Sequence, residues 1–251
     1  MHLDLSGKVA LVTGSYKGIG FGIAQTLHTE GCLVALNGRN SKGVSTATAK
    51  LFGSIGVVGD VTKTSDAQRL VAEVVKTFGR LDILVCCVGS GRSVPPGKEN
   101  ANEWNRVFAT NLWSVTNIVE AAQEALTASK GVIVCISSIC GVEVIDGAPI
   151  TYSAAKAALN AYVRGISRPL GKEGVRINAI ALGNILFEDS VWSHKLVEDK
   201  LAVFSMLKKE VSLDCFGSLT DVASLVSYLV SSRSGFATGG VWTLDGGQVR
   251  S

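Results

Sequence analysis

The sequence predicts an α/β fold in which helices cover both faces of a doubly wound, mostly parallel seven-stranded sheet. Seven short apolar runs alternate with longer helix-like segments along the 251 residues. Each run is apolar almost throughout, as strands covered on both faces are, and a β-α-β-α order places such strands parallel. Hydrophobic residues make up 47% of the chain, enough for one large core. No linker or repeat interrupts the pattern, which predicts a single domain over residues 1–251.

Each expected element follows from this alternation. The apolar runs predict strands at 8–14, 32–38, 55–61, 82–89, 131–138, 176–183 and 239–247. The segments between them predict helices that begin near Ile19, Ser65, Glu103, Tyr152 and Thr220. Ligands of such sheets bind beyond the carboxyl ends of the strands, so we expect functional residues directly after each apolar run.

Composition argues against several classes of protein. The net charge is +3 and no run of five Lys or Arg occurs, which gives little support to nucleic-acid binding. No stretch of about 18 apolar residues predicts a membrane span. The first eight residues do not resemble a signal peptide, so a cytoplasmic location is expected. The six cysteines lack C-x-x-C spacing and do not cluster with histidines, which predicts buried, reduced thiols and no metal site.

The first strand is followed by a glycine-rich turn, "TGSYKGIG" at Thr13–Gly20, which opens the first helix. Gly14 suits a tight turn, Gly18 suits close approach of backbone to a phosphate, and Gly20 suits close packing of helix on strand. A glycine-rich turn alone is a weak indication. Its place between strand and helix favours a site for the phosphates of a dinucleotide.

Further motifs follow in order: "GDVT" (59–62), "ATNLWS" (109–114), "ISSICG" (136–141), "YSAAK" (152–156), "VRINAIALG" (175–183) and "LDGG" (244–247). With the G-x-x-x-G-x-G turn, they resemble the short-chain dehydrogenase/reductase family over essentially the whole chain. The resemblance implies a Rossmann-type fold and hydride transfer between a nicotinamide cofactor and a ketone or secondary alcohol. The chain has a general resemblance to the 3-oxoacyl-carrier-protein reductases. Lys130 and Lys172 could bind an acidic carrier protein, but two scattered lysines give this little support.

The resemblance implies a catalytic set of Asn111, Ser138, Tyr152 and Lys156. Tyr152 would be the general acid/base, because an ammonium one helical turn away lowers a tyrosine pKa from its usual value of about 10. Lys156 would also hold the nicotinamide ribose, Ser138 would bind the substrate oxygen, and Asn111 would support a water leading to Lys156. Taken singly, these residues have plainer interpretations as solvated helix positions, a serine turn and a capping asparagine. Their joint appearance on the expected elements favours catalysis, with Ser138 preferred to Ser137 because alternation turns only one of the pair to the site.

The resemblance also implies the cofactor-binding residues: Gly14, Ser15, Tyr16, Lys17, Gly18, Ile19, Gly20, Arg39, Asp60, Val61, Val88, Gly89, Tyr152, Lys156, Gly183 and Ile185. NAD-binding proteins commonly carry an acid near the end of the second strand, and none occurs between Leu33 and Lys42. Arg39 and Lys17 instead suit a 2′-phosphate, which predicts NADP(H) as the cofactor and reduction as the direction. The alternative is that Arg39 is a solvated loop residue.

The sequence departs from the family pattern at three points. Cys86 and Cys87 stand where the family usually has two asparagines, Leu182 replaces a proline, and the spacing from Ser138 to Tyr152 is one residue longer than usual. The lost amides put cofactor affinity in doubt. A one-residue loop insertion can absorb the longer spacing.

A substrate lid is expected over residues 184–217, and the loops Ser90–Pro96 and Val142–Ile150 are expected to form the other walls. The lid mixes aromatic residues with hydrogen-bonding groups, which suits a hydroxylated substrate such as a sugar. An amphipathic helix with its charges in solvent is an equally good interpretation.

Three functions remain open from the sequence. The first is an NADPH-dependent carbonyl reductase acting on a small carbonyl or alcohol substrate. The second is an NAD-dependent alcohol or sugar dehydrogenase, and the third is a non-catalytic dinucleotide-binding or scaffold protein. The resemblance also predicts a homotetramer, with helices around 103–125 and 152–170 at its interfaces.

Overall fold

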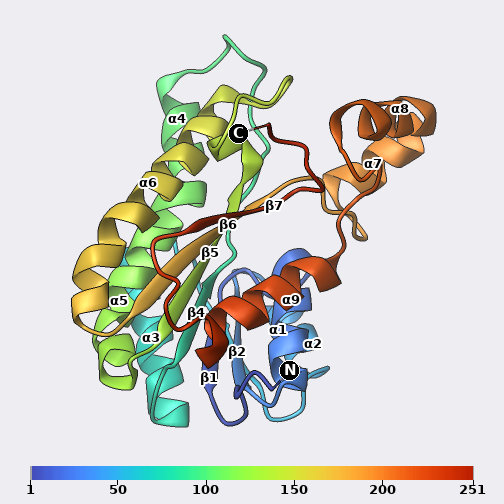
Figure 1. Cartoon of the computed structure of the whole chain (residues 1–251). Coiled ribbons are helices and arrows are strands. Elements are labelled where there is room, and N and C mark those ends of the chain that lie inside the picture. The colour runs from blue at the N-terminus through green and yellow to red at the C-terminus, as the bar shows by residue number, and fades with distance from the viewer. Residues whose placement is uncertain (1, 251) are drawn as a thin grey trace.

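The computed structural model describes residues 2–250 and shows one seven-stranded sheet between two layers of helices (Figure 1). All neighbouring strands are parallel in the order β3-β2-β1-β4-β5-β6-β7, so the predicted doubly wound sheet is confirmed. The strands are β1 (Val9–Val12), β2 (Leu33–Gly38), β3 (Ile55–Val58), β4 (Ile83–Cys86), β5 (Val132–Ser138), β6 (Arg176–Leu182) and β7 (Val241–Leu244).

Five helices begin within two residues of the five predicted starts. The helix at 114–129 falls largely in the helical region expected around 103–125, the two in the lid match the amphipathic helix that the sequence left open, and the one at 41–48 was not predicted. The helices are α1 (Gly18–Thr29), α2 (Ser41–Thr48), α3 (Thr64–Phe78), α4 (Ala101–Phe108), α5 (Ser114–Ser129), α6 (Ile150–Lys172), α7 (Val191–Glu198), α8 (Lys200–Glu210) and α9 (Leu219–Val230). A π-helical turn, Ala109–Trp113, joins α4 to α5. Within residues 2–250, no helix has both the length and the apolar character that a membrane span needs.

The strands are apolar throughout because each face of the sheet packs against helices. Leu84 of β4 lies in the core beneath α3, α5 and α6, whereas its neighbour Val85 lies in the core beneath α1 and α9. Figure 1 shows these two helical layers on opposite faces of the sheet. Burial on both faces therefore accounts for the absence of polar alternation in the strand sequences.

The segment predicted as a lid leaves the sheet after β6 and carries α7 and α8 (Figure 1). Its two ends lie side by side, because Gly217 N donates to the Asn184 carbonyl oxygen at 3.0 Å and Leu186 N donates to the Gly217 carbonyl oxygen at 2.9 Å. This pairing closes the lid into a loop at the carboxyl edge of the sheet, where the predicted site residues gather.

Candidate active site

The glycine turn between β1 and α1 has the backbone geometry that its spacing predicts. Gly14 and Gly18 have φ angles of +63° and +56°, a region that residues with side chains rarely adopt. A Cβ atom on Gly20 would overlap the carbonyl oxygen of Gly14. No side chain caps the first turn of α1, so its N–H groups remain open to an anion. The turn is a cradle whose shape and polarity fit a phosphate.

Asn37, at the end of β2, holds this turn in place. Its Oδ1 accepts from Gly14 N at 3.3 Å, and its Nδ2 donates to the carbonyl oxygens of Val57 and Gly59 at 3.0 and 3.2 Å. Its backbone N–H donates to the Ser15 hydroxyl at 3.0 Å, and that hydroxyl donates back to the β1 backbone at 2.6 Å. Ser15 therefore stiffens the turn, and Asn37 is a supporting residue that the sequence analysis missed.

A cavity of about 590 Å³ lies at the carboxyl ends of β2, β3 and β4. The predicted cofactor residues that line it are Gly14, Tyr16, Lys17, Arg39, Asp60, Val61, Val88 and Gly89. Lys17 and Arg39 bring two cations to it, and the Arg39 side chain is 78% exposed with its Nη1 3.6 Å from an Asp60 carboxylate oxygen. Asp60 is therefore an acid within reach of Arg39, although it follows β3 and not β2.

Gly89 is the point where two predicted catalytic residues meet. A Cβ atom there would be 3.1 Å from Asn111 Oδ1 and 3.2 Å from Lys156 Nζ. The Asn111 amide lies in the π-helical turn, accepts from Ser90 N at 3.0 Å, and donates to the carbonyl oxygens of Ser90 and Val107 at 3.1 and 3.0 Å. Asn111 thus fixes the loop after β4 and adjoins Lys156 across Gly89.

Tyr152 and Lys156 lie on one face of α6, as their spacing predicts. Lys156 Nζ lies 5.8 Å from the centre of the Tyr152 ring and donates to the Ile136 carbonyl oxygen at 2.9 Å. Burial lowers the pKa of Lys156 to about 8. Burial raises the pKa of Tyr152 to about 12, and the Ser138 hydroxyl offsets part of that rise. Burial therefore sets the pKa of Tyr152, in place of the lowering by Lys156 that the sequence predicted, and Tyr152 keeps its proton at neutral pH.

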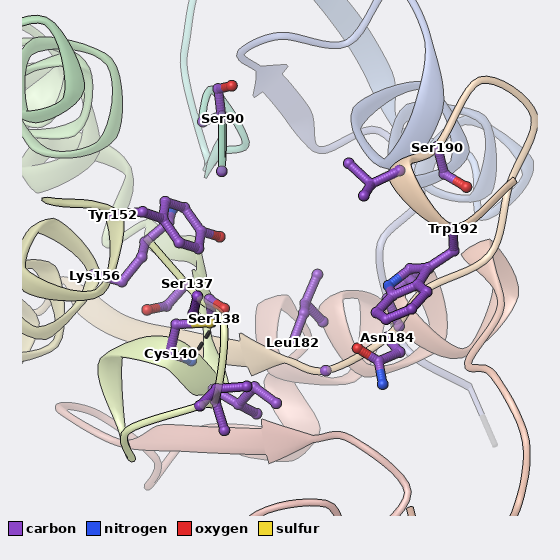
Figure 2. A pocket seen from close by; sticks show the side chains of 18 of the residues that line it. Ser90, Ser137, Ser138, Cys140, Tyr152, Lys156, Leu182, Asn184, Ser190 and Trp192 are labelled. Atoms are coloured by element: carbon purple, nitrogen blue, oxygen red, sulfur yellow. Dashed lines mark hydrogen bonds between the residues drawn. The ribbon is translucent and has the colours of Figure 1, made fainter. Parts of the chain in front are cut away.

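The two serines at the end of β5 are directed differently. Ser137 donates to Asn160 Oδ1 at 2.6 Å, and Asn160 in turn donates to the Gly141 carbonyl oxygen at 2.9 Å. Ser138 accepts from Cys140 N at 3.2 Å, and its hydroxyl lies in the same cavity wall as Tyr152 (Figure 2). Both serines line the cavity, but the Ser137 hydroxyl is already bonded to Asn160, which leaves Ser138 as the serine that can meet a substrate.

The cysteines that depart from the family pattern lie around Lys156. Cys86 of β4 is buried opposite Cys135 of β5, and Cys87 and Cys140 are half-buried. Burial raises the pKa of Cys87 to about 12, so this thiol stays protonated at neutral pH. The prediction of buried thiols is wrong for Cys215, which is exposed in the segment that closes the lid. No group of three or more metal-ligating side chains occurs in the part of the chain that the structure describes.

The end of β6 is held close to the end of β7. A Cβ atom on Gly183 would be 2.7 Å from the Cβ of Asp245, and Gly183 N donates to the Leu244 carbonyl oxygen at 3.0 Å. This contact explains why glycine stands at 183 even though leucine replaces the usual proline before it. Ile185 follows, buried, and pairs with Gly217.

The principal cavity, of about 1210 Å³, runs from the glycine turn past Tyr152 to the lid (Figure 2). The predicted residues that line it are Gly14, Lys17, Gly18, Ile19, Gly20, Gly89, Ser138, Tyr152, Lys156, Gly183 and Ile185. Phe187 is one of the aromatic residues expected in the lid, and its contact with the glycine turn was not predicted: a Cβ atom on Gly18 would be 2.9 Å from Phe187 Cε2. The arrangement places the Tyr152 phenol, the Ser138 hydroxyl and the Lys156 ammonium beside one continuous cavity.

Both predicted wall loops line this cavity, and the lid is helical, as one of its two interpretations expects. Residues 191–198 and 200–210 are helical, and some lid side chains point to solvent, such as Val197 at 88% exposure. Trp192 and Lys195 instead line the cavity. The lid is therefore a pair of helices with some side chains on the cavity and others in solvent.

A polar chain fastens the loop after β4 to the start of α6. The Ser93 hydroxyl lies 2.6 Å from the Thr151 hydroxyl and donates to Glu103 at 2.7 Å. Arg106 pairs with the same carboxylate and donates to the Arg92 carbonyl oxygen at 2.8 Å. Because Thr151 directly precedes Tyr152, this chain fixes one cavity wall relative to the Tyr152 ring.

The two lysines considered for an acidic carrier lie at the opposite edge of the sheet. Lys130 ends α5 just before β5 begins, and its Nζ donates to the Glu173 carbonyl oxygen at 3.0 Å. Lys172 is the last residue of α6. The length of β5, about 20 Å, separates Lys130 from Ser138, so neither lysine borders the cavity.

Comparisons with known proteins identify the family to which this chain is similar. A family model described as enoyl-(acyl carrier protein) reductase matches residues 14–248. Oxidoreductase asL5 of Sarocladium schorii is 33% identical over 97% of this chain and 96% of its own. The 3-oxoacyl-acyl-carrier-protein reductase FabG of Staphylococcus aureus strain N315 is 32% identical over 96% of this chain and 97% of its own.

Two solved structures are also similar. The L-sorbose reductase of Gluconobacter frateurii, complexed with NADPH and L-sorbose, has a TM-score of 0.93 and 27% identity over 100% of both chains. A gluconate 5-dehydrogenase of Burkholderia cenocepacia J2315, in complex with NADP and tartrate, has a TM-score of 0.90 and 26% identity over 98% of this chain and 97% of that one. The fold, the ordered motifs and relatives spanning nearly the whole length show that this chain belongs to the short-chain dehydrogenase/reductase family of oxidoreductases.

Proposed function

We propose that this protein is an NADP(H)-dependent carbonyl reductase that interconverts a ketone and a secondary alcohol, within a single domain over residues 1–251. The observation that carries the proposal is the convergence of Ser138, Tyr152 and Lys156 on one cavity that also contains the glycine turn. The turn fits a dinucleotide, because a side chain at Gly14, Gly18 or Gly20 would fill or distort it. When bound, the nicotinamide supplies or accepts the hydride.

In the proposed mechanism, the protein's own residues manage the substrate oxygen and its proton. Ser138 donates a hydrogen bond to the carbonyl oxygen and orients it toward Tyr152. Reduction requires Tyr152 as a neutral phenol, which is its form at pH 7. Tyr152 donates its proton as negative charge develops on the substrate oxygen. Lys156 stands one helical turn behind to stabilise the phenolate left on Tyr152 and to hold the nicotinamide ribose.

Asn111 completes the proposed site. Its amide fixes Ser90 and adjoins Lys156 across Gly89, so it orders the wall beside the ammonium. A water between Asn111 and Lys156 would then return a proton to the site from solvent. Ile19, Val61, Val88 and Ile185 would make apolar or backbone contacts with the cofactor.

The preference for NADP(H) rests on Lys17 and Arg39 at the smaller cavity. No acidic residue directly follows β2 to pair with either of them. Arg39 lies near Asp60, which follows β3, and its exposed guanidinium can turn from that carboxylate to a 2′-phosphate. Two similar structures contain NADPH or NADP, which supports the same preference. An NAD-dependent dehydrogenase is the second candidate, because the Asp60 carboxylate near the ribose would suit a 2′-hydroxyl.

The experiment that tests the proposal follows NADPH absorbance with a panel of ketones and compares NADPH with NADH at equal concentration. We expect turnover with NADPH and a lower kcat/KM with NADH. Tight NADPH binding without turnover of any ketone would favour the non-catalytic alternative. Higher efficiency with NADH would favour the NAD-dependent dehydrogenase.

We also propose that the protein is a homotetramer and is located in the cytoplasm. Trp104 and Trp113 are 36% and 48% exposed, and Phe108 lies between them with ring centres 5.8 and 6.3 Å away. This row of aromatic rings, on α4 and the turn after it, falls within the segment predicted as an interface and supports association of copies. Light scattering on the purified protein tests it, and a monodisperse monomer would refute it.

A further inference from the structure

The wall of the principal cavity opposite Tyr152 carries a pair of amide side chains that the proposed chemistry does not use. Asn184 Nδ2 donates to Gln248 Oε1 at 2.9 Å, and both residues line the cavity. They come from segments 64 positions apart, the start of the lid and the C-terminal tail. Figure 2 shows Asn184 facing the cavity, across from Tyr152 and Ser138.

Both amides stand on backbone that is held firmly. The Asn184 carbonyl oxygen accepts from Gly217 N at 3.0 Å, which ties it to the end of the lid. The tail around Gln248 is held by the Asp245 carboxylate, which accepts from Gly247 N at 2.9 Å and from Val249 N at 2.7 Å. Rigid support of this kind fixes the hydrogen-bonding groups before a ligand arrives.

The groups that the amides leave unused are complementary to hydroxyls. An amide has one acceptor oxygen and two donor hydrogens. After the bond between them, Asn184 retains its oxygen as an acceptor and Gln248 retains its NH₂ as a donor. An acceptor and a donor side by side match two neighbouring hydroxyl groups, each of which both donates and accepts.

Trp192 extends this surface with an aromatic face. Its ring centre lies 5.4 Å from that of Phe216, and Lys195 Nζ lies 4.7 Å from the Trp192 ring centre. These contacts hold the indole where it projects into the cavity beside Asn184 (Figure 2). The negative face of an indole attracts the weakly positive C–H groups of a hydroxylated carbon chain, and its N–H is a further donor.

From these contacts we infer that the substrate is a polyhydroxylated ketone, and that Asn184, Gln248 and Trp192 select it. The inference rests on the proposed reductase function, because Ser138 and Tyr152 bind its carbonyl while the amide pair binds hydroxyls further along the chain. An apolar ketone or an acyl thioester would leave the amide groups without partners, and buried polar groups without partners oppose binding. The distance of Lys130 and Lys172 from the cavity removes the pair of side chains that the sequence offered to an acidic carrier.

The test compares the 2-ketohexoses with 2-hexanone, which has the same carbon chain without the hydroxyls, using NADPH and the full chain. We expect at least one ketohexose to have the higher kcat/KM. The Gln248→Leu variant should lower the ratio of kcat/KM for that ketohexose to kcat/KM for 2-hexanone by about 10-fold or more. Gln68→Leu, the same change at an exposed position on α3, is the matched control and should alter neither.

A binding measurement separates failure of this inference from failure of the proposed function. Calorimetric titration of linear hexitols into the protein with NADPH, a pair that cannot react because both are reduced, should show binding that Gln248→Leu weakens and Gln68→Leu does not. Reduction of 2-hexanone with no ketohexose turnover and no hexitol binding would overturn the substrate class while the reductase function stands. Hexitol binding without any turnover would support the polyhydroxylated ligand and contradict the reductase.

Discussion

Lys156 Nζ donates a 2.9 Å hydrogen bond to the Ile136 carbonyl oxygen, and this bond holds the ammonium beside Tyr152. The bond ties α6 to β5, the strand that ends in Ser138. Three groups of the proposed mechanism are thereby placed relative to one another by one backbone contact. The same burial that makes the contact possible lowers the pKa of Lys156 to about 8.

That lowered pKa predicts how stability depends on pH. Below about pH 8 the folded protein carries a buried charge, whereas the unfolded chain releases the Lys156 proton only near its usual pKa of 10.5. The unfolded state thus binds more protons between these values, so the contribution of Lys156 to the free energy of unfolding rises with pH. Replacing it by methionine removes this rise.

The measurement is chemical denaturation of the wild type and the Lys156→Met variant from pH 7 to pH 10.5. The stability of the variant relative to the wild type should fall by up to roughly 3 kcal/mol across this range. The comparison cancels the buried thiols, which are present in both proteins. A difference that stays constant with pH would show that Lys156 titrates normally.

The close contact between Gly20 and Gly14 predicts the effect of a single methyl group. Gly20→Ala should place its Cβ against the Gly14 carbonyl oxygen, distort the glycine turn and destabilise the protein by about 1–3 kcal/mol. Gly165 in α6 has no atom within 4 Å of the position its Cβ would take, so Gly165→Ala should stabilise by roughly 0.5–1 kcal/mol. Thermal unfolding and NADPH titration of both variants check this, and equal effects would argue against the packing described.

The exposed Arg39 predicts a change of cofactor preference. Arg39→Asp should weaken NADPH binding by about 10-fold or more, because a carboxylate repels the 2′-phosphate. NADH binding should change much less, since it lacks that phosphate. Fluorescence titration with each nucleotide measures the two constants, and an equal loss for both would contradict the assignment of the smaller cavity to the phosphate.

The bond between Thr151 and Ser93 predicts a role in positioning the cavity wall. Thr151→Val removes this hydrogen bond, and we expect KM for the ketone to rise by about 5-fold with NADPH affinity unchanged. Thr151→Ser keeps the hydroxyl and should restore KM. If both variants lose activity equally, or if NADPH affinity falls with KM, the effect is one of general folding and not of the wall.

Local patterns predicted the strands, the glycine turn and Tyr152 with Lys156, because each is encoded within a few consecutive residues. Helix α2 was missed because its sequence is mostly polar and buries only Val44 and Ala47. Contacts between distant segments could not be predicted from spacing, and the bond from Asn184 to Gln248 is one of them. The raised pKa of Tyr152 could not be predicted either, because it comes from burial by segments that are distant in the sequence.

The proposed reduction depends most directly on Tyr152 as the proton donor. Tyr152→Phe keeps the ring and removes only the hydroxyl, so the measurement is kcat for NADPH-dependent reduction beside the Kd for NADPH in the same variant. We predict a loss of at least about 100-fold in kcat with an unchanged Kd. A variant that retained near-full activity would contradict the proposed chemistry.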